Sequence, residues 1–372
     1  ADIPEQIRNY LRRVSQASLI TKRPVYVLLV GAPRRITDIR NVSQIGSYGK
    51  TLKTPWELPI RYFYPLGGEL EPIPTDQYYA SVLVDWDTQL APYYRDAISP
   101  VTGLLEDRGD HWATGFDFNI QFSVGRVPVR STSDLRSWIQ KTLSWRTPQT
   151  FVESTFQSSR CLSRQPNEGD VWEDSATHQV IPHACQTDAG GDISTYANRE
   201  LPDMITSYSH GVYDEITRWP LTEGYDFSTS SPGLIKSPIL FVHGCEVGGV
   251  DFPNLSLAES TIGRRDGAVA FIGSSRSHWD SKFPFPNSIF HKGRLTLGEA
   301  FYGAKQDLVA ENHFPHKLID NLFMYTLYGD PALKVVEPSV KMIASPPVAF
   351  VSGRSATEVY SQSIRIQSLL TD

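Results

Sequence analysis

The stretch "PILFVHGCEVGG", residues 238–249, is an apolar run that ends on a glycine and then on Cys245. A similar arrangement occurs upstream in "MITSYSHG", residues 204–211, where a β-prone run ends on His210 and Gly211. Short apolar runs of this kind are typical of buried strands. The sequence therefore places a residue type suited to nucleophilic catalysis at the end of each of two expected strands.

Expected strands and helices alternate along the rest of the chain. The pattern predicts helices at residues 4–17, 131–145, 256–265 and 294–312, and strands at residues 23–33, 77–86, 122–130, 178–185 and 267–275. Such alternation is typical of an α/β protein with a mostly parallel sheet. Both halves carry it, so we expect two sheet-bearing subdomains at residues 1–148 and 149–335. Residues 336–372 are expected to form a β-rich tail or the start of a further domain.

Composition and charge narrow the class of protein. The chain has 372 residues, 40% of them hydrophobic and 20% charged, so it can bury sizeable cores. The net charge of -6 does not favour binding to nucleic acid or to an anionic membrane surface. No apolar run approaches the roughly 18 residues that span a bilayer. Because the chain begins at Ala1 rather than at methionine, the lack of a targeting segment is uninformative.

The three cysteines do not predict a disulfide framework or a zinc site. Cys161 and Cys185 could pair with each other or remain unpaired, and neither they nor Cys245 forms a C-x-x-C motif. Oxygen-rich loops at residues 84–89 and 106–112 could hold Ca²⁺ as a structural ion, with ordinary solvated loops as the alternative. We expect no cofactor to be required.

The two strand ends suggest a catalytic pair. In open α/β sheets, functional residues gather at the carboxyl ends of the strands. If the two strands are neighbours, His210 lies near Cys245 and can serve as its base or form an ion pair with a nucleophilic thiolate. The amides of Gly211 and Cys245 could then stabilise an oxyanion. The alternative is a small core cysteine and a structural histidine.

A second histidine could compete with His210. His243 precedes Cys245 by two positions, and alternation along a strand would place both side chains on the same face. His243 could therefore assist His210 or replace it.

The order of the motifs resembles the gingipain family, peptidase family C25, of the caspase-like clan of cysteine peptidases. The first half contributes "YVLLVG", "IPTDQYYA" and "VGRVPVR". The second half contributes "ITSYSHG", "ILFVHGCEVGG", "SLAES", "GAVAFIGSS" and "LYGDPAL". Together they cover roughly residues 23–335, and the ordered set is far more specific than any one motif.

The resemblance implies two caspase-like subdomains with mostly parallel sheets flanked by helices. It also implies a cysteine endopeptidase that acts through a Cys–His dyad and a thioester intermediate. In that comparison Cys245 is the nucleophile, His210 is its partner, and Gly211 and Cys245 supply the oxyanion amides. Trp279 borders the pocket for the residue that precedes the scissile bond, and Glu153 is the candidate acid that orients the histidine.

The chain departs from the family pattern in two places. Only a helix precedes "YVLLVG", where a complete βα unit is expected, and residues 151–180 are polar where a core strand is expected. Family members with Arg or Lys specificity would need an acidic pocket residue. The sequence offers several candidates and does not choose among them: Asp188, Asp192, Asp214, Glu215, Glu246 and Asp251.

The expected partner is a protein or peptide substrate. A sortase-like transpeptidase with the same chemistry up to the thioester is one alternative, and a catalytically inactive binding module is another. The tail after residue 336 could connect this unit to a larger multidomain protein. The resemblance implies secretion or the cell envelope, with a cytoplasmic location as the alternative.

Overall fold

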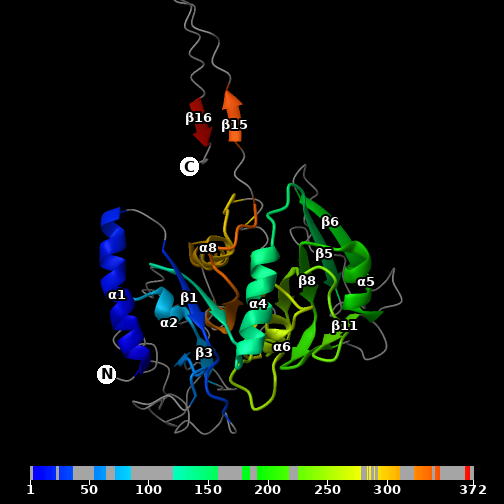
Figure 1. Cartoon of the computed structure of the whole chain (residues 1–372), viewed down its shortest axis with the longest axis horizontal. Helices are drawn as coiled ribbons and strands as arrows, with labels where there is room; N and C mark the ends of the chain where they lie inside the picture. The colour runs from blue at the N-terminus through cyan, green and yellow to red at the C-terminus, as the bar shows by residue number, and fades with distance from the viewer. Residues whose placement is uncertain are drawn as a thin grey trace, which may run out of the picture.

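The fold is seen in a computed structural model, drawn in Figure 1. The structure describes residues 3–21, 25–36, 54–63, 72–84, 120–157, 178–184, 191–217, 225–277, 283, 285, 289, 292–310, 322–336, 340–343 and 365–368.

One eight-stranded sheet crosses both halves of the chain (Figure 1). Its strands, in spatial order, are β1 (Tyr26–Val30), β4 (Ser123–Val127), β14 (Tyr325–Tyr328), β13 (Ala270–Ser274), β12 (Ile239–His243), β8 (Met204–Tyr208), β5 (Phe151–Gln157) and β6 (His178–Ala184). All neighbouring pairs are parallel except β13 and β14. The sheet therefore consists of two parallel blocks that run in opposite directions and meet at that antiparallel pair.

This architecture confirms the expected mostly parallel α/β fold flanked by helices. We expected a separate sheet in each half, whereas β1 and β4 of the first half continue the sheet of the second half through β14. The boundaries at residues 148 and 335 remain a prediction.

Successive residues of each central strand face opposite sides of the sheet, and two hydrophobic cores result. In β12, Ile239 and Phe241 belong to one core, and Leu240 and Val242 belong to the other. The first core is covered by α1 (Ile3–Thr21), α2 (Gln77–Ala80) and α8 (Leu297–Ala310). The second is covered by α4 (Thr132–Ser144), α5 (Ile193–Glu200) and α6 (Leu257–Gly263).

Three smaller sheets complete the described fold. A four-stranded sheet has the order β7 (Gly191–Asp192), β11 (Tyr225–Ser228), β10 (Glu215–Thr217) and β9 (His210–Val212). The hairpin of β2 (Arg61–Phe63) and β3 (Ile73–Thr75) lies in the first half. Antiparallel β15 (Val340–Ile343) and β16 (Arg365–Ser368) form a two-stranded sheet within residues 336–372.

The expectation of a strand at residues 77–86 is wrong, because this segment begins with the short helix α2. The amide of Gln77 donates to Thr75 Oγ1 across 3.2 Å, and the amide of Tyr79 donates to the Asp76 carbonyl across 2.9 Å. Tyrosine favours strands, but the tertiary context can override this preference. Here the polar residues that precede the tyrosines start a helical turn.

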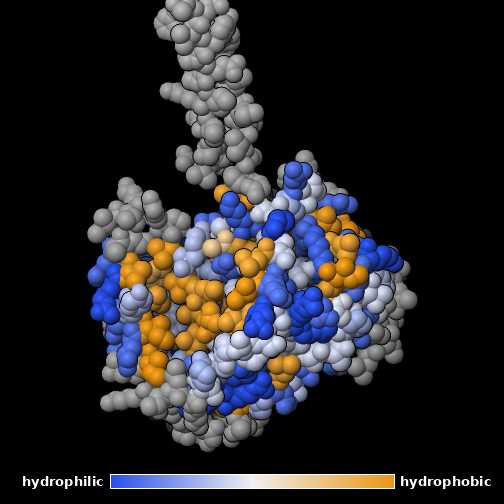
Figure 2. All heavy atoms as spheres, in the orientation of Figure 1, coloured by the Kyte–Doolittle hydropathy of each residue, from blue (hydrophilic) through white to orange (hydrophobic). Residues whose placement is uncertain are grey.

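The apolar run at residues 23–33 is typical of a strand that is buried on both faces, but β1 is not buried on both faces. Leu29 is buried, whereas Leu28 and Val30 are each 40% exposed. Figure 2 shows an apolar surface between α1 and α4, in the region where Figure 1 places β1. Among the described residues, β1 is the edge strand of the large sheet.

Several expectations fall on residues that the structure does not describe. These are the loop at 106–112, the loop at 84–89 apart from Val84, and both Cys161 and Cys185. Within the described ranges, no helix combines the length and apolarity needed to cross a membrane. In the same part of the chain, no three His, Cys, Asp or Glu side chains cluster so that they could hold a metal ion.

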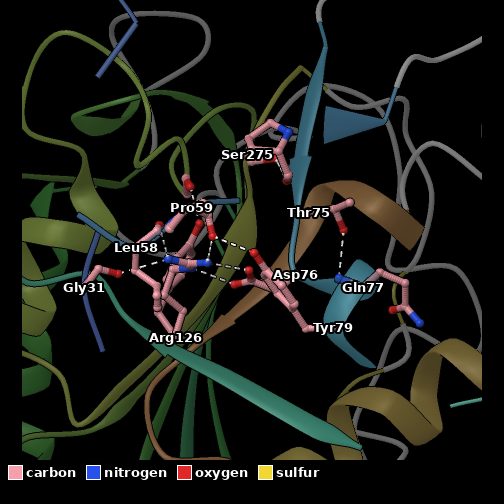
Figure 3. A network of polar contacts seen from close by, with 12 residues as sticks. Gly31, Leu58, Pro59, Thr75, Asp76, Gln77, Tyr79, Arg126 and Ser275 are labelled. Carbon is pink, nitrogen blue, oxygen red and sulfur yellow. Dashed lines mark hydrogen bonds and ion pairs between the residues drawn. The ribbon is translucent and has the colours of Figure 1, made fainter. Parts of the chain in front are cut away.

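Arg126 of β4 lies at the centre of a fully buried polar network (Figure 3). Its Nε and Nη2 donate to the two carboxylate oxygens of Asp76 across 2.8 and 2.7 Å. Its remaining hydrogens are donated to the carbonyls of Gly31, Leu58 and Pro59 across 3.0 to 3.1 Å. All five guanidinium donors thus have acceptors, which is what permits a buried arginine.

Replacing Arg126 by Met should lower the free energy of unfolding by about 3–5 kcal/mol, because Asp76 would remain buried without its counter-charge. Urea unfolding followed by circular dichroism measures the change. The matched control is Arg13→Met, since Arg13 is exposed on α1, and it should shift the value by less than about 0.5 kcal/mol. Equal effects of the two substitutions would contradict a special role for Arg126.

Lys141 of α4 caps the carboxyl end of α6. Its Nζ donates to the carbonyls of Thr261, Ile262 and Arg264 across 3.0, 2.8 and 2.5 Å. These carbonyls belong to the last turn of a helix, where they lack partners within the helix. Burial lowers the pKa of Lys141 to about 7.

Lys141→Met should destabilise the fold by about 1–3 kcal/mol, because three carbonyls at the end of α6, two of them buried, lose their donor. The folded pKa lies below the usual value of Lys, so the unfolded chain binds more protons above about pH 7 and stability rises with pH there. The advantage of wild type over Lys141→Met should therefore grow between about pH 7 and pH 9. Urea titrations at both pH values test this, with exposed Gln140→Met as the control. A constant or shrinking difference would contradict the lowered pKa.

Candidate active site

Two parallel strands end side by side at one edge of the large sheet. β8 and β12 are neighbours, and their last residues, Tyr208 and His243, form a register pair. The amide of Ser209 donates to the His243 carbonyl across 3.1 Å. Because parallel neighbours bring their carboxyl ends to the same edge, His210 and Cys245 follow adjacent strand ends.

The backbone of Gly211 packs directly against that of Cys245. A Cβ added to Gly211 would lie 2.8 Å from the Cys245 carbonyl oxygen, 3.2 Å from its amide nitrogen and 2.7 Å from Val247 Cγ1. A Cβ added to Gly244 would lie 3.5 Å from the Gly211 Cα. The His–Gly and Gly–Cys pairs, distant in sequence, are therefore adjacent in the fold.

His210 lies on a short hairpin that carries it to the surface. It is the first residue of β9, which pairs antiparallel with β10, and its partner in the register is Thr217. His210 is exposed, and Cys245 is half-buried. Both residues are therefore at least partly accessible at this edge of the sheet.

His243 occupies a different environment from Cys245. Its side chain is 7% exposed, and Nδ1 lies 2.6 Å from the Tyr325 hydroxyl. The rings of Tyr208 and Tyr325 pack against it, with centroids 5.5 and 5.9 Å away. β12 ends at His243, so strand alternation does not extend to Cys245. These contacts give His243 a packing role.

Glu153 is buried in the middle of the sheet. Its Oε2 lies 2.9 Å from His178 Nε2, and its Oε1 accepts from the Thr206 hydroxyl across 2.5 Å. The register places Glu153 beside Met204 at the start of β8, whereas His210 follows the end of that strand. Residues 151–157 belong to the stretch 151–180, which is polar where a core strand is expected. They form β5 because their buried polar groups find hydrogen-bond partners.

The acidic candidates for a specificity pocket separate into two groups. Asp192 caps α5 by accepting from the Ser194 amide, and Asp251 forms a buried ion pair with Arg276. Asp214, Glu215 and Glu246 lie within or next to the segments that carry His210 and Cys245. Asp188 and Trp279 lie outside the described residues.

The loop after Cys245 is held by the segment that follows β13. The Glu246 amide donates to the Arg276 carbonyl across 3.2 Å, and the Gly248 amide donates to the Ser274 carbonyl across 2.8 Å. The Ser277 hydroxyl donates to Glu246 Oε1 across 2.9 Å. Sequence reasoning assigned no role to Arg276 or Ser277, since neither stands in a recognisable motif.

Comparison with known proteins identifies the family to which the chain belongs. The family model of peptidase family C25 matches residues 1–336. The crystal structure of the Arg-specific cysteine proteinase gingipain R (RgpB) is 15% identical, with 91% of this chain and 71% of that chain covered and a TM-score of 0.54. A complex of the pro- and mature domains of Porphyromonas gingivalis RgpB is 16% identical, with 91% and 73% covered and a TM-score of 0.53. No curated protein sequence matches.

The family match and the fold agree. The matched residues include all eight strands of the large sheet and the segments that carry His210 and Cys245. The similarity to the gingipain structures shows a shared fold at low sequence identity. The chain therefore belongs to peptidase family C25, and it is a cysteine-type peptidase, a hydrolase.

Proposed function

We propose that the protein is an endopeptidase that uses Cys245 as nucleophile and His210 as its acid–base partner. The packing of Gly211 against Cys245 is the observation that carries this proposal, because His210 directly precedes Gly211 in the chain. Both residues are at least partly accessible. A cysteine is a strong nucleophile when a neighbouring histidine accepts its proton.

The reaction then runs in two stages. His210 takes the proton of the Cys245 thiol, and Sγ attacks the carbonyl carbon of the scissile peptide bond. The C–N bond breaks as His210 returns the proton to the leaving amine, and a thioester remains. His210 next removes a proton from water, the water oxygen attacks the thioester carbonyl, and Cys245 leaves as thiolate.

The backbone amides of Gly211 and Cys245 are the proposed donors to the oxyanion. The packing of Gly211 against the backbone of Cys245 supports this assignment, since backbone N–H groups aimed at the developing charge stabilise a tetrahedral intermediate. Removal of one such donor typically costs about 10²–10³ in kcat.

The proposed substrate is an extended segment of a protein or peptide. On the resemblance, Trp279 would border the pocket for the residue before the scissile bond. The contacts of Glu153 with His178 and Thr206 support a stabilising role among β5, β6 and β8 for this carboxylate, in place of direct contact with His210. The proposed reaction uses only side chains and amides of this chain, together with water.

One alternative with the same chemistry up to the thioester is distinguished by its products. A transpeptidase would transfer the acyl group of the thioester to an amine, so added peptide amines would appear in the products by mass spectrometry.

Cys245→Ala and His210→Ala should each abolish cleavage of a fluorogenic peptide library varied at the residue before the scissile bond. Losses of about 10³-fold or more are expected when a nucleophile or its base is removed. The same library reveals the preferred residue. Alkylation followed by mass spectrometry should label Cys245 faster than Cys161 or Cys185. Equal labelling, with unchanged cleavage in Cys245→Ala, would refute the assignment.

Gly211→Ala should lower kcat/KM by about 10²-fold, because the new methyl group would push apart the segments that carry His210 and Cys245. Steady-state kinetics on a peptide from the library measures the change. The matched control is Gly263→Ala at the end of α6, where the nearest atom to the added Cβ would be 3.4 Å away. Equal kinetics for the two variants would show that close packing at Gly211 is unimportant.

A further inference from the structure

The residue after the proposed nucleophile has an unusual backbone conformation. Glu246 has φ 62°, and Leu201, which caps the end of α5, is the other non-glycine residue with positive φ among those described. Few non-glycine residues adopt this region, and those that do persist only where surrounding contacts impose it. Such residues cluster at active sites. The contacts that impose this conformation on Glu246 therefore bear on how the neighbouring Cys245 is held.

Two contacts clasp Glu246 to consecutive residues after β13. Its amide donates to the Arg276 carbonyl across 3.2 Å, and its Oε1 accepts from the Ser277 hydroxyl across 2.9 Å. We refer to these two contacts, formed by Glu246, Arg276 and Ser277, as the clasp. One contact holds the backbone of Glu246 and the other holds its side chain. Together they restrict the backbone dihedrals of Glu246, and so the orientation of the peptide bond that joins it to Cys245.

The far side of the clasp is anchored in the core. Arg276 is 2% exposed and forms two hydrogen bonds with the Asp251 carboxylate, of 2.9 and 2.6 Å. The Tyr62 hydroxyl donates to the same carboxylate across 2.9 Å. The Arg276 carbonyl also accepts from the Ser274 hydroxyl across 2.7 Å. The Arg276–Ser277 segment is therefore a rigid support for Glu246.

We infer that Glu246 is a positioning residue, whose clasp to Arg276 and Ser277 sets the orientation of the Cys245 thiol and amide toward His210 and Gly211. The inference rests on the proposed function, in which those groups carry the reaction. The side-chain half of the clasp needs an acceptor oxygen and not a negative charge. A small rotation of Cys245 would misplace its sulfur, and misplacement by about 1 Å can cost about 10²-fold in rate.

The experiment compares Glu246→Gln, Glu246→Ala, Ser277→Ala and the double alanine variant on the peptide library. Glu246→Gln keeps the acceptor and should retain activity within about threefold of wild type. Each single alanine variant should lower kcat by about tenfold, with KM nearly unchanged, since orientation and not substrate binding is affected. The double variant should be no worse than Glu246→Ala, because both substitutions break the same contact.

Controls separate this inference from the proposed function. Glu5→Ala removes an exposed carboxylate on α1 and should leave the kinetics unchanged. The rate of Cys245 alkylation by iodoacetamide, followed by mass spectrometry, should fall in both single alanine variants even if no peptide is cleaved. Wild type that cleaves nothing would overturn the proposed function, whereas unaltered kcat and alkylation in Glu246→Ala would overturn the clasp alone.

Two further outcomes are decisive. If Glu246→Gln loses activity only on peptides with Lys or Arg near the scissile bond, while Ser277→Ala does not, Glu246 recognises substrate charge and the positioning role is overturned. If Glu246→Ala fails to fold, as judged by its thermal unfolding, Ser277→Ala still tests the clasp, because Ser277 is exposed.

Discussion

The guanidinium of Arg126 joins segments that are otherwise far apart in the sequence. Its side chain bonds to Asp76 before α2 and to the carbonyls of residues 31, 58 and 59. Its backbone carbonyl accepts from the Gly329 amide across 2.8 Å, where β4 meets β14. A buried ion pair adds little net stability relative to well-packed apolar side chains, although removing one of its partners is costly. The importance of Arg126 here is geometric, since this one residue connects the loops of the first half to the sheet of the second.

The first half of the chain also supports the candidate active site. Beyond Cys245, the loop at residues 246–251 receives hydrogen bonds from the Ile36 amide to the Asp251 carbonyl and from Arg130 to the Val250 carbonyl, both of 2.8 Å. The Tyr62 hydroxyl adds a bond to the Asp251 carboxylate. The half without the proposed dyad thus restrains the loop that follows the nucleophile.

Local sequence patterns predicted the structure correctly where the residues of one element determine its conformation. The helix expected at residues 131–145 forms as α4, with Ser131 accepting from the Asp134 amide. The same patterns failed at residues 77–86, where Asp76 and Thr75 start a helical turn in a run of β-prone tyrosines. They also failed at β1, because the exposure of Leu28 and Val30 depends on which elements cover the sheet.

The apolar runs that end near His210 and Cys245 were visible in the sequence, because run length and the order of residues are local properties. The adjacency of β8 and β12, the junction of β4 with β14 and the pairing of Glu153 with His178 were decided only by the tertiary structure. The positive φ of Glu246 belongs to the same group, since contacts with residues after β13 hold it. Each of these features depends on residues distant in sequence, and no short-range periodicity records such contacts.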